Sequence, residues 1–168
     1  MRKRRRDDTT GTLGRCQRGF GITGTINRDG FPHATYLADV PVVQQISIFL
    51  ENRPGRLGEL CDVLADEGVN IEAIMVPSGT DYGIVHVVVD RPADALQALQ
   101  QRSYRTYTSR VLDVEIPNQP GALAKLADHL AEIGIDIKYA YSAVTDGAGR
   151  LILAVSDVER ASAELDAR

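Results

Sequence analysis

The stretch "ENRPGRL" at residues 51–57 recurs as "PNQPGAL" at residues 117–123, an offset of 66 positions. Both copies spell Asn-x-Pro-Gly-x-Leu, and each lies between an alternating apolar stretch and a longer stretch with helical spacing. At the same offset, ten positions between Ile46 and Met75 are identical in the two halves. The identical positions include glycines at both ends of each expected helix, the pairs Gly55/Gly121 and Gly68/Gly134. The sequence therefore predicts a tandem repeat of one structural unit.

The spacing of apolar residues predicts the elements of each unit. Ile46, Ile48 and Leu50 alternate as in a strand, whereas Leu57, Leu60, Cys61 and Leu64 follow the spacing of one helix face. Strands are expected at 44–50, 69–76, 81–90, 104–110, 110–116, 135–144 and 149–155, and helices at 55–68, 91–102, 122–134 and 157–168. The order is that of a βαββαβ unit, so the fold class is α+β, with two ferredoxin-like units side by side.

The second unit lacks a clear last strand, because only "LDAR" remains after the pattern of its second helix. An unpaired edge is then expected, and three covers are open: the N-terminal tail, a partner chain, or none if the chain is cut short. The expected domains are a tail at 1–43 that is disordered or starts too early, a first unit at 44–108 and a truncated second unit at 109–168.

Charge is distributed unevenly along the chain. Residues 1–43 carry eight Lys/Arg and four Asp/Glu, whereas the remainder carries 11 Lys/Arg and 19 Asp/Glu. The acidic folded part argues against nucleic acid as a partner, although the basic run at 2–6 leaves that role open for the tail. "GFGITG" at 19–24 matches a dinucleotide-binding motif by letter only, since no strand or helix pattern flanks it.

The composition also bears on location. No apolar run is long enough for a membrane helix, and no signal peptide pattern follows the basic N-terminus. The two cysteines, Cys16 and Cys61, form neither a CxxC pair nor a metal-ligand spacing. A cytoplasmic protein without a membrane partner is expected.

The repeated turn offers a site for a carboxylate. Proline and glycine lead from a strand into a helix, whose N-terminal amide groups and partial positive charge favour an anion. The strand starts at 70–71 and 136–137 offer backbone carbonyls to an ammonium group, so the two features suit a free amino acid. The alternative is that Pro-Gly only makes a tight turn between strand and helix.

From residue 44 onward the chain resembles tandem ACT domains, regulatory modules that bind amino acids. The resemblance rests on "ISIFLENRPGRLGELCDVLADEGVNIEAI", "DYGIVHVVVD" and "VEIPNQPGALAKLADHLAEIGIDIKYAY". It implies a ligand where two units meet, against the first strand-helix turn and the start of the second strand. The implied ligand-binding residues are Asn52, Pro54, Gly55, Arg56, Leu57, Asn70 and Ile71 in the first copy, and Asn118, Pro120, Gly121, Ala122, Leu123, Asp136 and Ile137 in the second.

No set of side chains predicts catalysis. His33, His86 and His129 share no spacing with a nucleophile and an acid, and each is interpreted as a surface residue, with His86 on the face opposite Val85 and Val87. Tyr139 and Tyr141 lie on one side of a strand, where a core or interface role is favoured.

The predicted function is therefore a non-catalytic regulatory protein that binds an amino acid, forms a homodimer and signals to a metabolic enzyme, with no metal and no cofactor. The alternative is an assembly module that binds no ligand and pairs with an enzyme or itself through its sheet edge. An enzyme is a third hypothesis, which turnover abolished by substitution of His86 or His129 would support.

Overall fold

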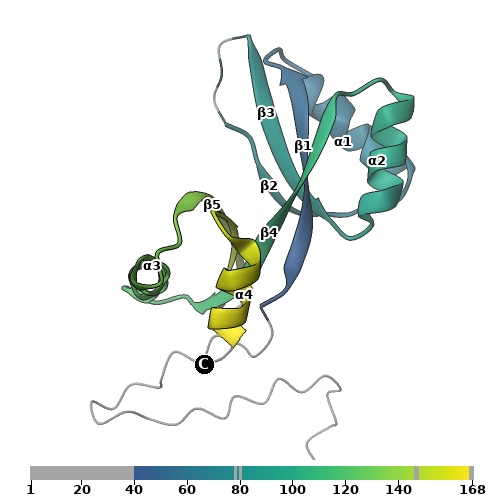
Figure 1. Cartoon of the computed structure of the whole chain (residues 1–168). Coiled ribbons are helices and arrows are strands. Elements are labelled where there is room, and N and C mark those ends of the chain that lie inside the picture. The colour runs from purple at the N-terminus through teal and green to yellow at the C-terminus, as the bar shows by residue number, and fades with distance from the viewer. Residues whose placement is uncertain (1–39, 78, 80, 146–147, 167–168) are drawn as a thin grey trace, which may run out of the picture. The chain divides into compact units, whose positions relative to one another are not determined.

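The computed structural model describes residues 40–77, 79, 81–145 and 148–166. Most of the predicted tail, with His33, the basic run and the "GFGITG" stretch, lies outside these residues. The elements are β1 Val42–Glu51, α1 Arg56–Asp66, β2 Ile71–Met75, β3 Tyr82–Val89, α2 Pro92–Gln101, β4 Thr106–Pro117, α3 Ala122–Glu132, β5 Ile137–Thr145, β6 Ala148–Val155 and α4 Val158–Asp166 (Figure 1).

All six strands form one antiparallel sheet in the order β2-β3-β1-β4-β6-β5. The first four places, β2-β3-β1-β4, are the strand order of a ferredoxin-like unit. The second unit continues the same sheet from β4 through β6 to β5. The predicted α+β class with two ferredoxin-like units is confirmed.

Strand β4 belongs to both units. Its beginning pairs with β1, from Ile48 opposite Thr106, and its end pairs with β6, as far as Pro117 opposite Ala148. The sequence analysis expects two strands here, yet no glycine or proline interrupts residues 106–116. The strand therefore runs on without a turn, and the expected boundary at 108/109 falls inside it.

The missing last strand of the second unit is replaced from the other end of the chain. Val42 lies opposite Leu112, and the Asp113 N–H donates a hydrogen bond to the Pro41 carbonyl at 3.0 Å. Val40 is 4% exposed, and its backbone bonds to Asp166 and Ser162 of α4. Of the three covers considered, a segment that precedes the first unit is the one found, and β1 begins two residues before the expected start at 44.

The four helices pack on one face of the sheet. Leu60, Leu64 and Leu99 of α1 and α2 cover the first unit, where Ile46, Ile48 and Val87 are fully buried. A second core lies beneath α3 and α4. Its fully buried members are Leu112, Val114, Leu126, Leu130, Leu153 and Ala161. Each unit thus has its own apolar core.

Two helix positions differ from the predicted pattern. Leu57 and Leu123 are 38% and 48% exposed, so the first turn of each helix stands clear of its core. Val63 and its repeat equivalent His129 are buried instead, at 7% and 6% exposure. The interpretation of His129 as a surface residue is therefore wrong.

The helix-free faces of the two units meet each other. A third cluster joins Ala73 and Val88 of the first unit to Ile152 and Ala154 of the second, around Val111 of the shared strand. Edge strands β2 and β5 approach each other, although they lie at opposite ends of the strand order. Because sheets twist, the two halves can close on their common face.

Candidate ligand sites and the contact between the units

The repeated turn has the same geometry in both units. The Arg53 N–H donates to the Glu51 carbonyl at 3.0 Å, and the Gln119 N–H donates to the Pro117 carbonyl at 2.8 Å. Gly55 and Gly121 have φ angles of 90° and 86°, a left-handed conformation that glycine adopts without a steric penalty. The glycines in the repeat are therefore required by the backbone.

Each turn leaves the N-terminus of its helix open. The first helical bond in α1 runs from the Glu59 N–H to the Gly55 carbonyl, and the equivalent bond in α3 runs from Lys125 to Gly121. No side chain caps either helix, and in the described part of the chain the Leu57 N–H bonds to nothing outside its helix. Unbonded N–H groups at a helix N-terminus carry partial positive charge and accept an anion.

The strand starts also repeat bond for bond. The Asn70 N–H donates to the Asp90 carboxylate at 2.9 Å, and the Asp136 N–H donates to the Ser156 hydroxyl at 3.1 Å. In return, the Asp90 and Ser156 N–H groups donate to the carbonyls of Asn70 and Asp136. Each of these carbonyls keeps one lone pair for a further donor.

Within one chain, the turns and the strand starts lie apart. Ile71 at the start of β2 pairs with Val89 on β3. The adjacent residue of β3, Val88, pairs with Gln45 on β1, and Gln45 precedes Asn52 by seven residues. Seven residues of strand span about 24 Å. The same reasoning separates the second turn, at residue 118, from the second strand start, at residue 136. The two turns are also far from each other, because they lie beyond opposite ends of the 12-residue β4. A turn and the strand start of its own unit therefore cannot share one ligand.

The two turns differ in their side chains. Arg56 forms ion pairs with Glu51 and Glu59, whereas its equivalent Ala122 carries no charge. Asn52 donates a 2.6 Å hydrogen bond to the Gly79 carbonyl, which ties the first turn to the loop between β2 and β3. A groove of about 940 Å³ runs along the side of α1 and shares only Arg56 with the predicted site residues.

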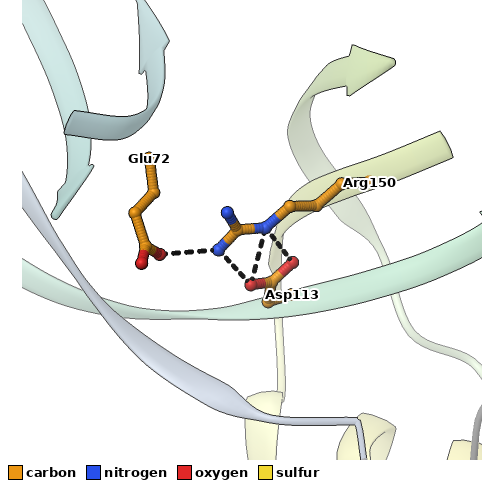
Figure 2. A network of polar contacts seen from close by, with 3 residues as sticks. All are labelled: Glu72, Asp113 and Arg150. Atoms are coloured by element: carbon orange, nitrogen blue, oxygen red, sulfur yellow. Dashed lines mark hydrogen bonds and ion pairs between the residues drawn. The ribbon is translucent and has the colours of Figure 1, made fainter. Parts of the chain in front are cut away.

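Charged side chains clamp the two helix-free faces together. Figure 2 shows Arg150 of β6 between Asp113 of β4 and Glu72 of β2. The guanidinium donates two 2.9 Å bonds from Nε to Asp113 and one 2.8 Å bond from Nη2 to Glu72. The hydrogen bond to Asp113 raises the pKa of Arg150 above its ordinary value, although burial opposes this. Glu72 is the extra residue of a bulge in β2, a feature that can redirect a side chain.

A buried polar network lies on the same faces. Gln45 is fully buried, and its Nε2 lies 2.6 Å from the Tyr139 hydroxyl and 3.1 Å from His86 Nδ1. The Tyr141 hydroxyl donates to Gln45 Oε1 at 3.0 Å. His86 faces away from Val85 as predicted, but it is half-buried against Gln45 and Tyr139 and is not the surface residue expected. The contacts of both tyrosines are consistent with a core or interface role. Burial is the main cause that raises the pKa of Tyr141.

The sequence analysis did not identify Gln45, Glu72, Asp113 or Arg150. The alternation along β1 places Gln45 on the face opposite Ile46, which is a usable signal for a polar residue on the second face of the sheet. No sequence signal pairs Glu72 with Arg150, because the contact depends on how the two units pack.

Other site types find little support in the described residues. Within them, no group of three or more His, Cys, Asp or Glu side chains could hold a metal ion. His129 is buried, and neither of its ring nitrogens has a hydrogen-bond partner among the groups that the structure describes. None of the described helices combines the length and apolar character needed to cross a membrane.

Comparison with known proteins identifies the class. The tandem units and repeated turns define a pair of ferredoxin-like modules, and a family model described as an ACT domain pair matches residues 41–165. Protein BT0572 from Bacteroides thetaiotaomicron has a similar structure, with a TM-score of 0.71 and 34% identity over 75% of this chain and 87% of that one. The chain belongs to the ACT domain pair family.

More distant structures share the fold. The regulatory subunit of aspartate kinase from Thermus thermophilus has a TM-score of 0.62 and 17% identity, over 80% of this chain and 95% of that one. The same subunit from Thermus flavus has a TM-score of 0.57 and 16% identity, over 79% and 95% of the two chains. None of the curated proteins compared with the chain matches it.

Proposed function

We propose that this protein is a non-catalytic regulator that binds a free amino acid at its repeated turns. The ligand carboxylate bonds to the open N–H groups at the start of α1 or α3, and its ammonium group is received by the carbonyl of a strand start. The site residues are those expected from the resemblance, with Gly55 and Gly121 at the centre of the two turns. Metal and cofactor have no part in this function.

The observation that carries the proposal is the bond-for-bond repetition of an uncapped helix start beside an exposed leucine. Leu57 and Leu123 occupy equivalent positions, and each exposes an apolar side chain at a helix start that no side chain of the described residues caps. An amino acid has the matching features, a carboxylate and a side chain of variable polarity. Membership in the ACT domain pair family and the aspartate kinase regulatory subunits with the same fold support a regulatory role.

A second chain completes the site in this proposal. A turn and the strand start of its own unit are about 24 Å apart along β1, so we place the turn of one protomer beside a strand start of another, with their helices antiparallel. Ligand binding then stabilises the pairing of chains, which gives the protein a means of signalling to a metabolic enzyme in the cytoplasm. Sedimentation velocity with and without ligand tests the pairing.

A thermal-shift panel of the twenty amino acids on the full chain tests binding. A ligand at a hundredfold excess over its Kd stabilises the native state by about 2.7 kcal/mol, a shift of several degrees for a domain of this size. Response to one amino acid or a chemically related group supports the proposal. No response from a folded chain contradicts it.

Matched variants locate the site. Gly58 and its equivalent Ala124 are exposed in the first turns of α1 and α3, and a Cβ at Gly58 meets open space. Gly58→Glu puts a carboxylate at the helix start, where it suits the helix dipole but repels an incoming carboxylate. Gly58→Gln is the neutral control. We expect the glutamate variant, and not the glutamine variant, to lose the ligand response if the first turn is used, and Ala124→Glu with Ala124→Gln reports on the second.

One observation favours the alternative of an assembly module. Four large apolar residues, Phe49, Tyr82, Ile84 and Tyr107, are 38% to 65% exposed on the helix-free face of the first unit. The equivalents of Phe49 and Ile84 are the charged Glu115 and Arg150, so the patch is specific to one unit. Dimerisation without ligand that Phe49→Lys abolishes, with no response in the amino acid panel, would favour this function.

A further inference from the structure

We propose that His86 is a proton-sensitive latch between the two units, whose neutral ring holds β5 against β1 and β3 and whose protonation loosens that contact. The proposal concerns the contact between units and is independent of which ligand binds. It rests on the geometry of the buried Gln45 network.

The network assigns the ring a hydrogen-bond acceptor at Nδ1. The Tyr141 hydroxyl donates to Gln45 Oε1, which directs Gln45 Nε2 toward Tyr139 and toward His86 Nδ1, at 3.1 Å. The Ser47 hydroxyl lies 2.8 Å from the same ring nitrogen. The Gln45 amide nitrogen can only donate, so its hydrogen bond makes Nδ1 the acceptor, and the Ser47 hydroxyl can donate to the same atom. We therefore assign the ring proton to Nε2, which leaves the ring neutral.

The ring is also in direct contact with the second unit. His86 on β3 stacks on Tyr139 on β5, with ring centroids 5.0 Å apart and planes inclined by 25°. Tyr139 in turn contacts Gln45 on β1. The same side chains that keep His86 neutral therefore attach β5 to the first unit.

Protonation of Nδ1 places a donor against the donors of Gln45. The contact is then lost, or the Gln45 amide rotates and reverses its bonds to Tyr139 and Tyr141. Gln45 is fully buried, so water cannot readily replace a lost bond. Either response disturbs the attachment of β5.

The surroundings of the ring supply no compensating negative charge. The side chains against the ring are Gln45 and Ser47 from β1 and Tyr139 from β5, and Met75 lies opposite it on β2. Ser109 from β4 and Tyr141 from β5 contact Gln45. Asp113 and Arg150 of the charged cluster act on Tyr141, and in the described part of the chain no carboxylate contacts the His86 ring.

The direction of the pH effect follows from burial, which lowers the pKa of His86 below its ordinary value of 6.5. A folded-state pKa below the unfolded one means that the unfolded chain binds the proton more readily. This contribution to stability is complete above pH 6.5 and decreases as the pH falls through the folded-state pKa.

Urea unfolding of the full chain at about pH 8 and about pH 5.5 tests the latch. His86→Asn is the informative variant, because its amide oxygen can accept from Gln45 and Ser47 but does not titrate. We expect the wild type to lose more of its urea midpoint on acidification than the variant does. Equal losses in the two proteins would overturn the proposal.

A second readout does not depend on the variant folding. The ¹⁵N shift of His86 Nδ1 in the native wild type at neutral pH should be that of an unprotonated acceptor nitrogen. On acidification, amide exchange in β5, corrected for intrinsic rates, should increase more than exchange in α1. A protonated Nδ1 at neutral pH, or equal increases in the two elements, would contradict the latch.

Discussion

Arg150 and Glu72 are 78 residues apart in sequence, yet the Arg150 guanidinium donates to the Glu72 carboxylate at 2.8 Å (Figure 2). The bond crosses from β6 of the second unit to the bulge of β2 in the first. Glu72 directly follows Ile71, one of the expected ligand residues, so the second unit helps to hold a candidate site of the first. The two ACT units are therefore joined in two ways: by the hydrogen bonds of the shared strand β4, and by side chains between their helix-free faces.

Substitution of Arg150 tests this clamp. Arg150→Met removes the donors of Asp113, whose side chain is only 12% exposed, and we expect a loss of about 2 kcal/mol in the free energy of unfolding. Urea denaturation measures the loss. Asp113→Asn combined with Arg150→Met is the control, and it should recover part of the stability because the buried Asp113 carboxylate is no longer left unpaired. A double variant less stable than Arg150→Met would contradict this account.

Tyr141→Phe tests the buried network. Removal of the hydroxyl leaves Gln45 Oε1 without a donor, at a cost of about 1 to 2 kcal/mol. The raised pKa of Tyr141 also predicts an alkaline effect, since the unfolded chain releases the tyrosine proton near pH 10 while the folded chain retains it. Stability should fall as the pH rises above 10 in the wild type, and this part of the slope should be absent in Tyr141→Phe. Absorbance titration of tyrosinate in the wild type and in Tyr141→Phe checks this, because the step at the highest pH should be absent from the variant.

Substitution of glycine by alanine should have opposite effects on stability at Gly55, which is left-handed, and at Gly58, which is helical. Gly55→Ala forces a Cβ into a φ of 90° and should cost about 1 to 2 kcal/mol. Gly58→Ala lies in the first turn of the same helix with open space around its Cβ, and it should stabilise by about 0.5 to 1 kcal/mol. Thermal unfolding of the two variants compares them directly. If Gly55→Ala were neutral or stabilising, the assigned role of Gly55 would be wrong.

Val40→Ala tests the replacement of the missing strand. The side chain is 4% exposed in the core beneath α3 and α4, so its truncation should cost about 2 kcal/mol. Hydrogen exchange should show the loss of protection in α4 and the end of β4 before α1. Protection lost first in α1 would mean that Val40 does not support the second unit.

The repeat made much of the fold predictable from the sequence. Paired glycines at 55/121 and 68/134 have positive φ, which explains why the letters recur. The continuity of β4 was also open to prediction, because its sequence contains no turn residue. The position of Val40 was not, since its partners Ser162 and Asp166 are more than a hundred residues away and no local pattern links them.

The sequence predicted the turns of the candidate site, but it did not predict the polar contacts between the two units. The helix pattern placed Leu57 in the core, although the helix start stands clear of it. The hydrogen bond between Gln45 and Tyr139 depends on how the helix-free faces of the two units pack together, which hydrophobic periodicity does not predict. The expected ligand residues in the turns and strand starts stay a prediction.

The most direct test of the proposed function is a ¹H–¹⁵N NMR titration of the full chain with the twenty amino acids. If the turns bind a carboxylate, one amino acid or a related group should shift the amide signals of Leu57 and Gly58, of Leu123 and Ala124, or of both pairs, in a saturable way. Signals of the Gln45 network should move less. If every amino acid leaves these four amides unmoved in a folded chain, the repeated turns are architecture, and the proposed function is wrong.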